Sequence, residues 1–291
     1  MLDVTAHSQA NPTLAAPAWR RALAHPLLGA LGLFALCAGL LAFVQFGTAG
    51  LADNDGYYHM KMGLLMREQG LAPEFIWLPL SILNPAAFYD HHMLFHAYLA
   101  LFVGDGSEPS MILGAKLASV AMPALAFVAI WWLLRGQGLA WPGLWAIGLL
   151  GVSEAFLYRM SMPRAQSASL LVLALGMHWL LARRYWLLAP LGFVYVWLYN
   201  AFPMLLGLAG VVAVATLLTE RRLEWRGLAY AALGIALGLV LGFLVLLFGY
   251  HTSTAGAGES TSPPSVIAGS TSGSSSDSSG SADSAGSTTV T

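Results

Sequence analysis

The chain has 291 residues, of which 57% are hydrophobic and only 9% are charged, and its formal net charge is −1. Soluble domains carry about 25% charged residues, so this composition excludes an ordinary soluble globular protein. The nearly neutral charge gives no reason to expect nucleic acid as a partner. The single cysteine, Cys37, excludes a disulfide within the chain.

Seven apolar segments, taken in chain order, predict an all-α integral membrane protein with about seven transmembrane helices. A helix of about 20 apolar residues crosses a hydrocarbon core of ~30 Å. The segments are His25–Gly47, Met111–Leu134, Leu139–Tyr158, Gln166–Ala182, Tyr185–Phe202, Pro203–Leu218 and Leu228–Tyr250. The first has a longer apolar core than the ~7–15 residues of a signal peptide, so we interpret it as a retained helix.

The arginines orient these predicted helices. Under the seven-span count, eight of them fall on one side: Arg20, Arg21, Arg135, Arg183, Arg184, Arg221, Arg222 and Arg226. The positive-inside rule makes that side cytoplasmic. We therefore expect a cytoplasmic N-terminus and a long first extracytoplasmic loop over about residues 50–110.

Composition divides the chain into three parts: a cytoplasmic lead (1–24), a transmembrane domain (25–251) and a Ser/Gly-rich tail (252–291). The tail holds too few large apolar residues to offset the entropy of ordering, so we expect it to be disordered. Its abrupt start fits a native tail and a truncated end equally well.

The predicted outer loop contains two clusters of ionisable residues. Charge beside a bilayer is costly unless it is hydrated, paired or bound to a metal. Carboxylates favour Mn²⁺ or Mg²⁺, whereas imidazoles shift the preference toward Zn²⁺, which is our second choice of ion. The candidate metal ligands are Asp53, Asp55, Asp90, His91 and His92. The alternative is that the two aspartates cap a helix, and that His92 and His96 are interfacial histidines on one helix face.

Two further patterns bear on function and packing. Arg159 and Arg164 follow the third predicted span on the outer side, where guanidinium groups could bind a phosphate or diphosphate. The alternative is that they extend toward lipid headgroups. Gly234, Gly238 and Gly242 recur every four residues in the last span, which predicts close packing against another helix.

Three stretches resemble the catalytic subunit of oligosaccharyltransferases and their bacterial single-subunit relatives, which have the GT-C glycosyltransferase fold. They are Asn54-Asp55-Gly56-Tyr57, Tyr158-Arg159-Met160-Ser161 and Trp197-Leu198-Tyr199-Asn200-Ala201-Phe202-Pro203. The resemblance runs over roughly residues 25–220, the membrane portion of that family.

This resemblance implies a metal-dependent glycosyltransferase whose donor is a saccharide linked to a polyprenyl diphosphate. Asp55 takes the role of the family's metal-binding aspartate, which also engages the acceptor. We assign His59, Arg159 and Arg164 to the donor diphosphate. The implied location is a bacterial inner membrane, among membrane lipids, with the site on the periplasmic side. The acceptor stays open.

The chain also departs from the family pattern. The segment Pro163–Ser167 contains no carboxylate where the family usually has a second acidic motif, and no Trp-Trp-Asp acceptor motif occurs. Two alternatives therefore stay open. One is a non-catalytic GT-C-like membrane protein or assembly partner. The other is a transporter or metal-handling protein that uses the histidines.

Overall fold

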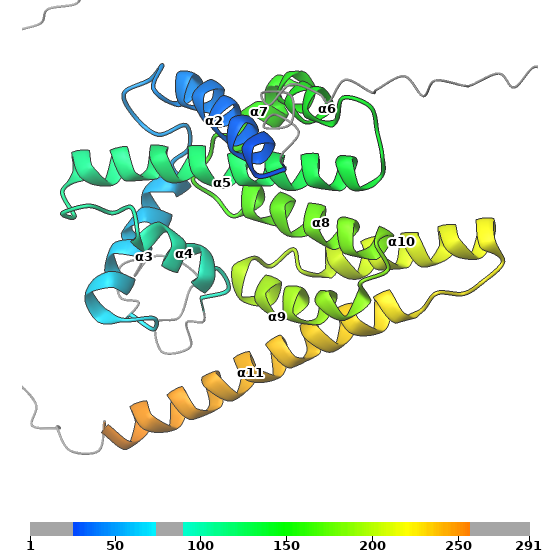
Figure 1. The fold of residues 1–291 in the computed structure, drawn as a ribbon. Coiled ribbons are helices and arrows are strands. Elements are labelled where there is room, and N and C mark those ends of the chain that lie inside the picture. Colours follow the sequence, from blue (N-terminus) through cyan, green and yellow to red (C-terminus); the bar gives the residue numbers. More distant parts are fainter. Residues whose placement is uncertain (1–25, 74–89, 257–291) are drawn as a thin grey trace, which may run out of the picture. The chain divides into compact units, whose positions relative to one another are not determined.

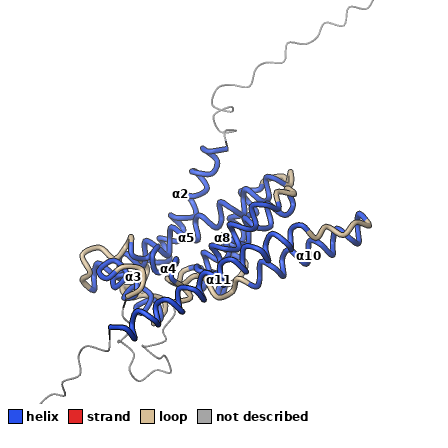
Figure 2. Tube along the Cα trace, turned by 90° about the horizontal axis from the view of Figure 1, so that it is seen from below, coloured by secondary structure: helices blue, strands red, loops and turns tan. Residues whose placement is uncertain are grey.

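The computed structural model describes residues 26–73 and 90–256, and every regular element within these ranges is a helix (Figures 1 and 2). The predicted lead, the Ser/Gly-rich tail from residue 257 and part of the long loop, residues 74–89, lie outside the described residues. Contacts divide the chain into Met1–His251 and Thr252–Thr291, and the description below concerns the first unit. The helices are α2 (Pro26–Gln45), α3 (Asp55–Gln69), α4 (Met93–Ala100), α5 (Glu108–Gly136), α6 (Pro142–Gly148), α7 (Glu154–Met160), α8 (Gln166–Leu181), α9 (Leu188–Leu198), α10 (Pro203–Glu220) and α11 (Arg226–Gly256), with short 3₁₀ helices η2 (Leu149–Gly151) and η3 (Tyr185–Leu187).

Among the described residues, four helices are long and apolar enough to cross a membrane: α2, α5, α10 and the Arg226–Val245 part of α11. These four helices mark the chain as a membrane-associated protein. Three shorter apolar segments, Pro142–Gly151, Gln166–Leu181 and Tyr185–Leu198, coincide with the other three predicted spans. The 16 residues of α8 extend only about 24 Å as a helix, less than a ~30 Å hydrocarbon core. The count of seven spans therefore stays a prediction.

One predicted span, Leu139–Tyr158, is interrupted in the structure. Helix α6 ends at Gly148, η2 follows, and α7 begins only at Glu154. The Ser153 hydroxyl accepts a hydrogen bond from the Phe156 backbone N–H at 3.1 Å, which caps the start of α7. Glycines at both ends of η2 and a serine cap are poor helix-interior residues, and this explains why one apolar run forms two helices.

Helix α5 is the centre of the helical packing. It contacts α2, α8, α6, α3 and α4, and in Figure 1 it crosses the picture between α2 and α8. Within its apolar window 61% of the residues are buried, against 17% for α2 and for α10. Alanines along α5, such as Ala115, Ala118 and Ala124, let its neighbours approach closely. Helices α2 and α10 instead keep many of their apolar side chains exposed, as expected for surfaces that face lipid.

The close packing predicted for the glycines of the last span is confirmed for Gly234 and Gly238 of α11. A Cβ added at Gly234 would overlap the Ala189 backbone carbonyl of α9, and Gly238 packs against Val196 one helical turn further along. From the other side, Gly192 of α9 faces Ala231 and Ile235. Small residues on both helices thus allow backbone-to-backbone contact.

Replacing Gly234 with alanine is therefore expected to destabilise the protein by about 2 kcal/mol, because the methyl group meets backbone that cannot rotate away. Thermal unfolding of the detergent-purified chain measures this change. Gly207→Ala is the matched control, since nothing lies within 4 Å of the added Cβ on α10. An equal melting temperature for Gly234→Ala and the parent would contradict the α9–α11 contact.

Candidate functional site

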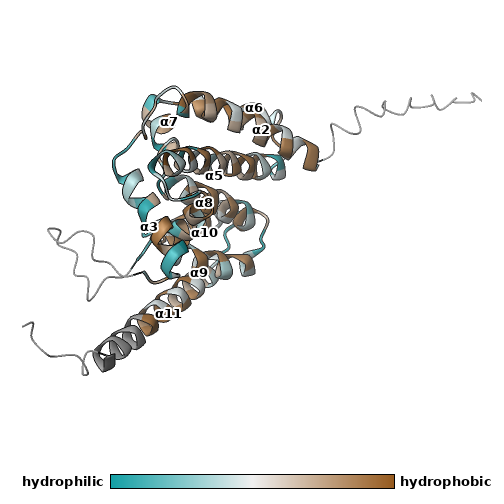
Figure 3. Cartoon of the chain, turned by 90° about the vertical axis from the view of Figure 1, so that its left-hand side faces the viewer, coloured by the Kyte–Doolittle hydropathy of each residue, from teal (hydrophilic) through white to brown (hydrophobic). Residues whose placement is uncertain are grey.

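The polar residues gather where α3, α4, the segment before α8 and the end of α9 meet. We call this group the polar cluster and define it by Asp53, Asp55, His59, Asp90, His91, His92, His96, Arg164 and Tyr199. Figure 3 shows hydrophilic colouring at α3 beside the mostly hydrophobic α5 and α2. The cluster has an ion-paired part, around Arg164, and a histidine part, around Asp90.

In the ion-paired part, the Arg164 guanidinium binds both aspartates that the sequence analysis assigned to a metal. Its Nε donates to Asp53 Oδ2 and its Nη2 donates to Asp53 Oδ1 at 2.8 Å, a bidentate arrangement. Nη2 also forms an ion pair with Asp55 Oδ2. The side chain of Asp53 is 13% exposed and that of Asp55 is 61% exposed, so Asp55 is the carboxylate more open to a ligand. The hydrogen bonds that Arg164 donates to Asp53, together with the negative charge of both carboxylates, raise the pKa of Arg164 above its usual range.

A glycine allows this arrangement to form. A Cβ added at Gly56 would overlap the Pro163 ring, so only glycine lets the first turn of α3 lie against the segment that carries Arg164. The predicted helix caps are not observed: the N-cap of α3 is Asn54, without a side-chain cap bond, and the aspartates on either side turn to Arg164. Tyr158 of α7 donates to the Ala52 carbonyl at 2.8 Å and joins the same two segments.

In the histidine part, three side chains form a continuous chain of hydrogen bonds. Asp90 Oδ2 lies 2.6 Å from His96 Nδ1, and His96 Nε2 lies 2.7 Å from His59 Nδ1. A carboxylate only accepts, so His96 Nδ1 carries a proton. With His96 neutral, its Nε2 accepts from the N–H of His59 Nδ1, which leaves His59 Nε2 as the basic nitrogen.

Helical spacing explains why these histidines meet. His59 and Gly63 are four residues apart on α3, and His96 and Ala100 are four apart on α4, so each pair lies on one helix face. A Cβ added at Gly63 would lie 3.1 Å from the Ala100 backbone nitrogen, which shows how closely the two helices approach. This contact leaves His96 completely buried and His59 7% exposed.

Burial dominates the charge state of the histidines. Burial, with smaller contributions from the nearby positive charges of His96, His92, Arg164 and His91, lowers the pKa of His59 to about 2. Burial also lowers the pKa of His92 to about 4, with smaller effects from His91 and His96. His59 and His92 are therefore neutral at pH 7 and can accept protons or hydrogen bonds.

The remaining candidates divide between the cluster and the surface. His92 donates its backbone N–H to Asp90 Oδ1 at 2.9 Å, and its ring packs against Tyr199, with ring centroids 5.4 Å apart. The ring centroid of His91 lies 4.2 Å from that of His92. Arg159 instead lies exposed on α7, and no contact within the described ranges brings it to Arg164. The geometry thus groups every predicted site residue except Arg159.

The predicted Mn²⁺ or Mg²⁺ ligands do not fit an ion in this arrangement. Among residues 26–73 and 90–256 no group of three or more His, Cys, Asp or Glu side chains could hold a metal. Arg164 binds Asp53 and Asp55, while Asp90 accepts from both His96 and the His92 backbone. A divalent ion would have to displace these donors. The metal site stays a prediction, and no chemical step below depends on it.

Gln45 and Lys116 are buried polar residues outside the cluster that sequence reasoning missed. Gln45, at the end of α2, donates from Nε2 to the Ser161 carbonyl. Lys116 of α5 is 4% exposed and donates to the Gln45 carbonyl at 3.0 Å and to the Thr48 carbonyl. The signal was present, because Lys116 is a charge inside an apolar run.

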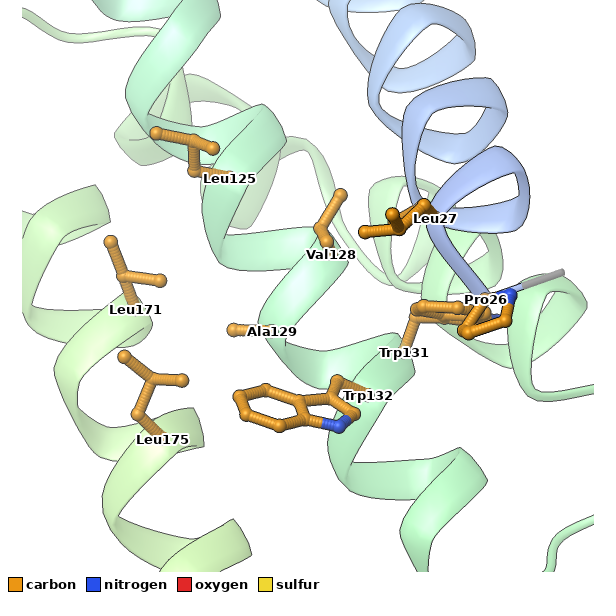
Figure 4. A pocket seen from close by; sticks show the side chains of 10 residues that line it. Pro26, Leu27, Leu125, Val128, Ala129, Trp131, Trp132, Leu171 and Leu175 are labelled. Carbon is orange, nitrogen blue, oxygen red and sulfur yellow. The ribbon is translucent and has the colours of Figure 1, made fainter. Parts of the chain in front are cut away.

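A separate cavity of about 370 Å³ lies between α2, α5 and α8, toward the N-terminal end of α2 (Figure 4). Its lining is apolar, with Leu125, Val128, Trp132 and Leu171 among the side chains shown. It contains no titratable group and lies at the opposite end of α2 from Asp53, so we assign it no chemistry.

Comparison with known proteins identifies no relative: no family model, no curated protein sequence and no solved structure matches the chain.

Proposed function

We propose that the chain is the membrane portion of a GT-C-type glycosyltransferase that transfers a saccharide from a polyprenyl-diphosphate carrier. One observation carries the proposal: the three stretches that resemble oligosaccharyltransferases meet at the polar cluster. Residues 54–57 open α3 beside Arg164, Tyr158 bonds to Ala52, and Tyr199 packs on His92. The first and last of these stretches lie about 140 residues apart in the sequence, and their convergence on one polar cluster supports a shared role.

The chemistry of transfer assigns roles to these residues. Displacement at the anomeric carbon has two requirements. One group must receive the proton of the acceptor, and a positively charged group must lie beside the departing diphosphate. Asp55 is the exposed carboxylate of the cluster and is the residue that would engage the acceptor. Arg164, and Arg159 if it approaches, would stabilise the leaving diphosphate. The neutral His59 adds a hydrogen-bonding group at the same place.

The proposal includes the seven-span arrangement and its orientation. With α6–α7, α8 and α9 as the three additional spans, the cluster and the arginine-rich ends fall on opposite sides of the membrane. The positive-inside rule then places the polar cluster at the periplasmic face of a bacterial inner membrane. A polyprenyl-linked donor reaches this face with its saccharide in water and its lipid tail in the bilayer.

Loss of the Asp55 carboxylate is expected to lower transfer at least about 100-fold, the usual size of a general acid–base contribution. The assay follows hydrolysis of a saccharide-loaded donor in proteoliposomes, in which water takes the saccharide and polyprenyl diphosphate is released, so the natural acceptor need not be known. Asp55→Asn is compared with Glu154→Gln, which removes an exposed carboxylate on α7 outside the cluster. Equal turnover by the parent and Asp55→Asn would overturn the assignment.

The ion pair itself favours a second candidate, a non-catalytic membrane protein that keeps the fold. Arg164 binds both aspartates and so gives them a structural role that needs no substrate. This candidate predicts no release of polyprenyl diphosphate by the parent chain, while Asp53→Asn still lowers the melting temperature. Turnover by the parent chain decides between the two.

A further inference from the structure

A second polar feature lies outside the cluster, at the junction of the C-terminal end of α2 with the first turns of α5. A pocket of about 450 Å³ opens there, lined by Phe46, Thr48, Ala49, Glu108, Pro109, Ile112, Leu113 and Lys116. Most of this lining is apolar. Among the described lining residues, Lys116 is the one charged side chain that is buried. A buried lysine in an apolar helix is costly and is normally paired.

The charge of Lys116 is only partly compensated. Its ammonium donates to the Gln45 and Thr48 carbonyls and lies 5.5 Å from the centre of the Phe46 ring. Gln45 is the last residue of α2, and Phe46 and Thr48 follow it, so the ammonium lies at the helix C-terminus, whose dipole supplies about half a negative charge. Within the described ranges no carboxylate forms an ion pair with Lys116. An ammonium carries three donors, and the two carbonyls use two of them.

Position along α5 indicates where the missing charge would come from. Lys116 lies eight residues after Glu108, about 12 Å inward from the start of the helix. Glu108 is exposed at the rim of the pocket and is too far along the helix to pair with Lys116. The apolar walls formed by Ile112 and Leu113 suit a lipid better than a fully hydrated ion.

From the buried, half-compensated lysine and the apolar pocket beside it, we infer that this junction binds an anionic membrane lipid, with its phosphate against Lys116. A phosphate oxygen accepts a hydrogen bond from the third N–H of the Lys116 ammonium. The upper parts of the acyl chains lie along Ile112 and Leu113. The site is separate from the polar cluster and does not depend on the proposed glycosyl transfer.

The test measures lipid binding by the purified full chain with native mass spectrometry, using phosphatidylglycerol as the probe and phosphatidylcholine as the neutral comparison. Lys116→Met is expected to weaken phosphatidylglycerol binding about tenfold, the value of one charge-assisted hydrogen bond. Lys61→Met removes an exposed lysine of α3 and should leave binding unchanged. Equal binding of the two lipids by the parent chain would overturn the inference.

A second variant covers the case in which Lys116→Met fails to fold. Leu113 is 49% exposed at the pocket, so Leu113→Trp fills the pocket while keeping the lysine and the core. It should also weaken phosphatidylglycerol binding about tenfold, with the melting temperature of the parent. Unchanged binding in a folded Leu113→Trp protein would contradict the site. Displacement of the lipid by millimolar inorganic phosphate would mean that a free anion, not a lipid, is the ligand.

Discussion

Replacing Arg164 with methionine is expected to lower both the stability of the chain and its transfer activity. The change leaves Asp53, which is 13% exposed, without its bidentate partner and brings Asp53 and Asp55 into unrelieved repulsion. Breaking a fully buried pair costs about 3–5 kcal/mol, and the partial exposure here reduces the expected loss to about 1–2 kcal/mol. Thermal unfolding and polyprenyl diphosphate release would be measured on the same preparation.

A double-mutant cycle isolates the ion pair from the loss of the side chain itself. If the pair stabilises the fold, Arg164→Met combined with Asp53→Asn should be less unstable than the sum of the two single changes. For the melting temperature alone, Arg159→Met is the matched control, because it removes an exposed arginine five residues away. Strict additivity of the two changes would show that Arg164 and Asp53 do not interact.

Acid is expected to destabilise the protein below pH 6.5 through His59. The pKa of this histidine falls from 6.5 to about 2 in the folded chain, so the unfolded chain binds the proton first as the pH drops. The contribution of His59 to the free energy of unfolding is therefore complete above pH 6.5, and it is lost progressively as the pH falls toward 2. Between pH 6.5 and pH 5 this removes about 2 kcal/mol from the free energy of unfolding.

The melting temperature measured from pH 7.5 to pH 5 checks this expectation. His59→Gln keeps a hydrogen-bonding side chain but cannot titrate, so its stability should fall less steeply with acid than that of the parent. His91→Gln changes an exposed histidine of the same cluster, and no steep change in slope is expected from it. Parallel pH profiles for the parent and His59→Gln would contradict the buried, neutral His59.

Sequence alone predicted the all-α class and the positions of most helices, because a long apolar run that crosses a membrane forms a helix. The spans at α2, α5, α10 and α11 meet the length and hydropathy of a crossing helix. The break between α6 and α7 was missed because hydropathy does not respond to Gly148, Gly151 and the Ser153 cap. Local backbone preference, not hydrophobicity, decided that boundary.

The sequence predicted most of the residues of the candidate site, but it did not predict which of them contact one another. Crowding of Asp and His near Asp53 and Asp90 indicated a site, and the structure brings both groups together with Arg164. Which groups bond could not be read from spacing, because Arg164 is 111 residues from Asp53 in the chain. His96 was seen only as the helical neighbour of His92, whereas its main partners are Asp90 and His59.

The most direct test of the account is the side of the membrane on which the polar cluster lies. In intact bacterial cells, a membrane-impermeant maleimide would be applied to Glu154→Cys, near the outer end of the third predicted span, and to Arg222→Cys, between α10 and α11, each in a Cys37→Ser background. We expect Glu154→Cys to react in intact cells and Arg222→Cys to react only after permeabilisation. Labelling of both positions from outside, or of Arg222→Cys alone, would contradict an outer-face transferase.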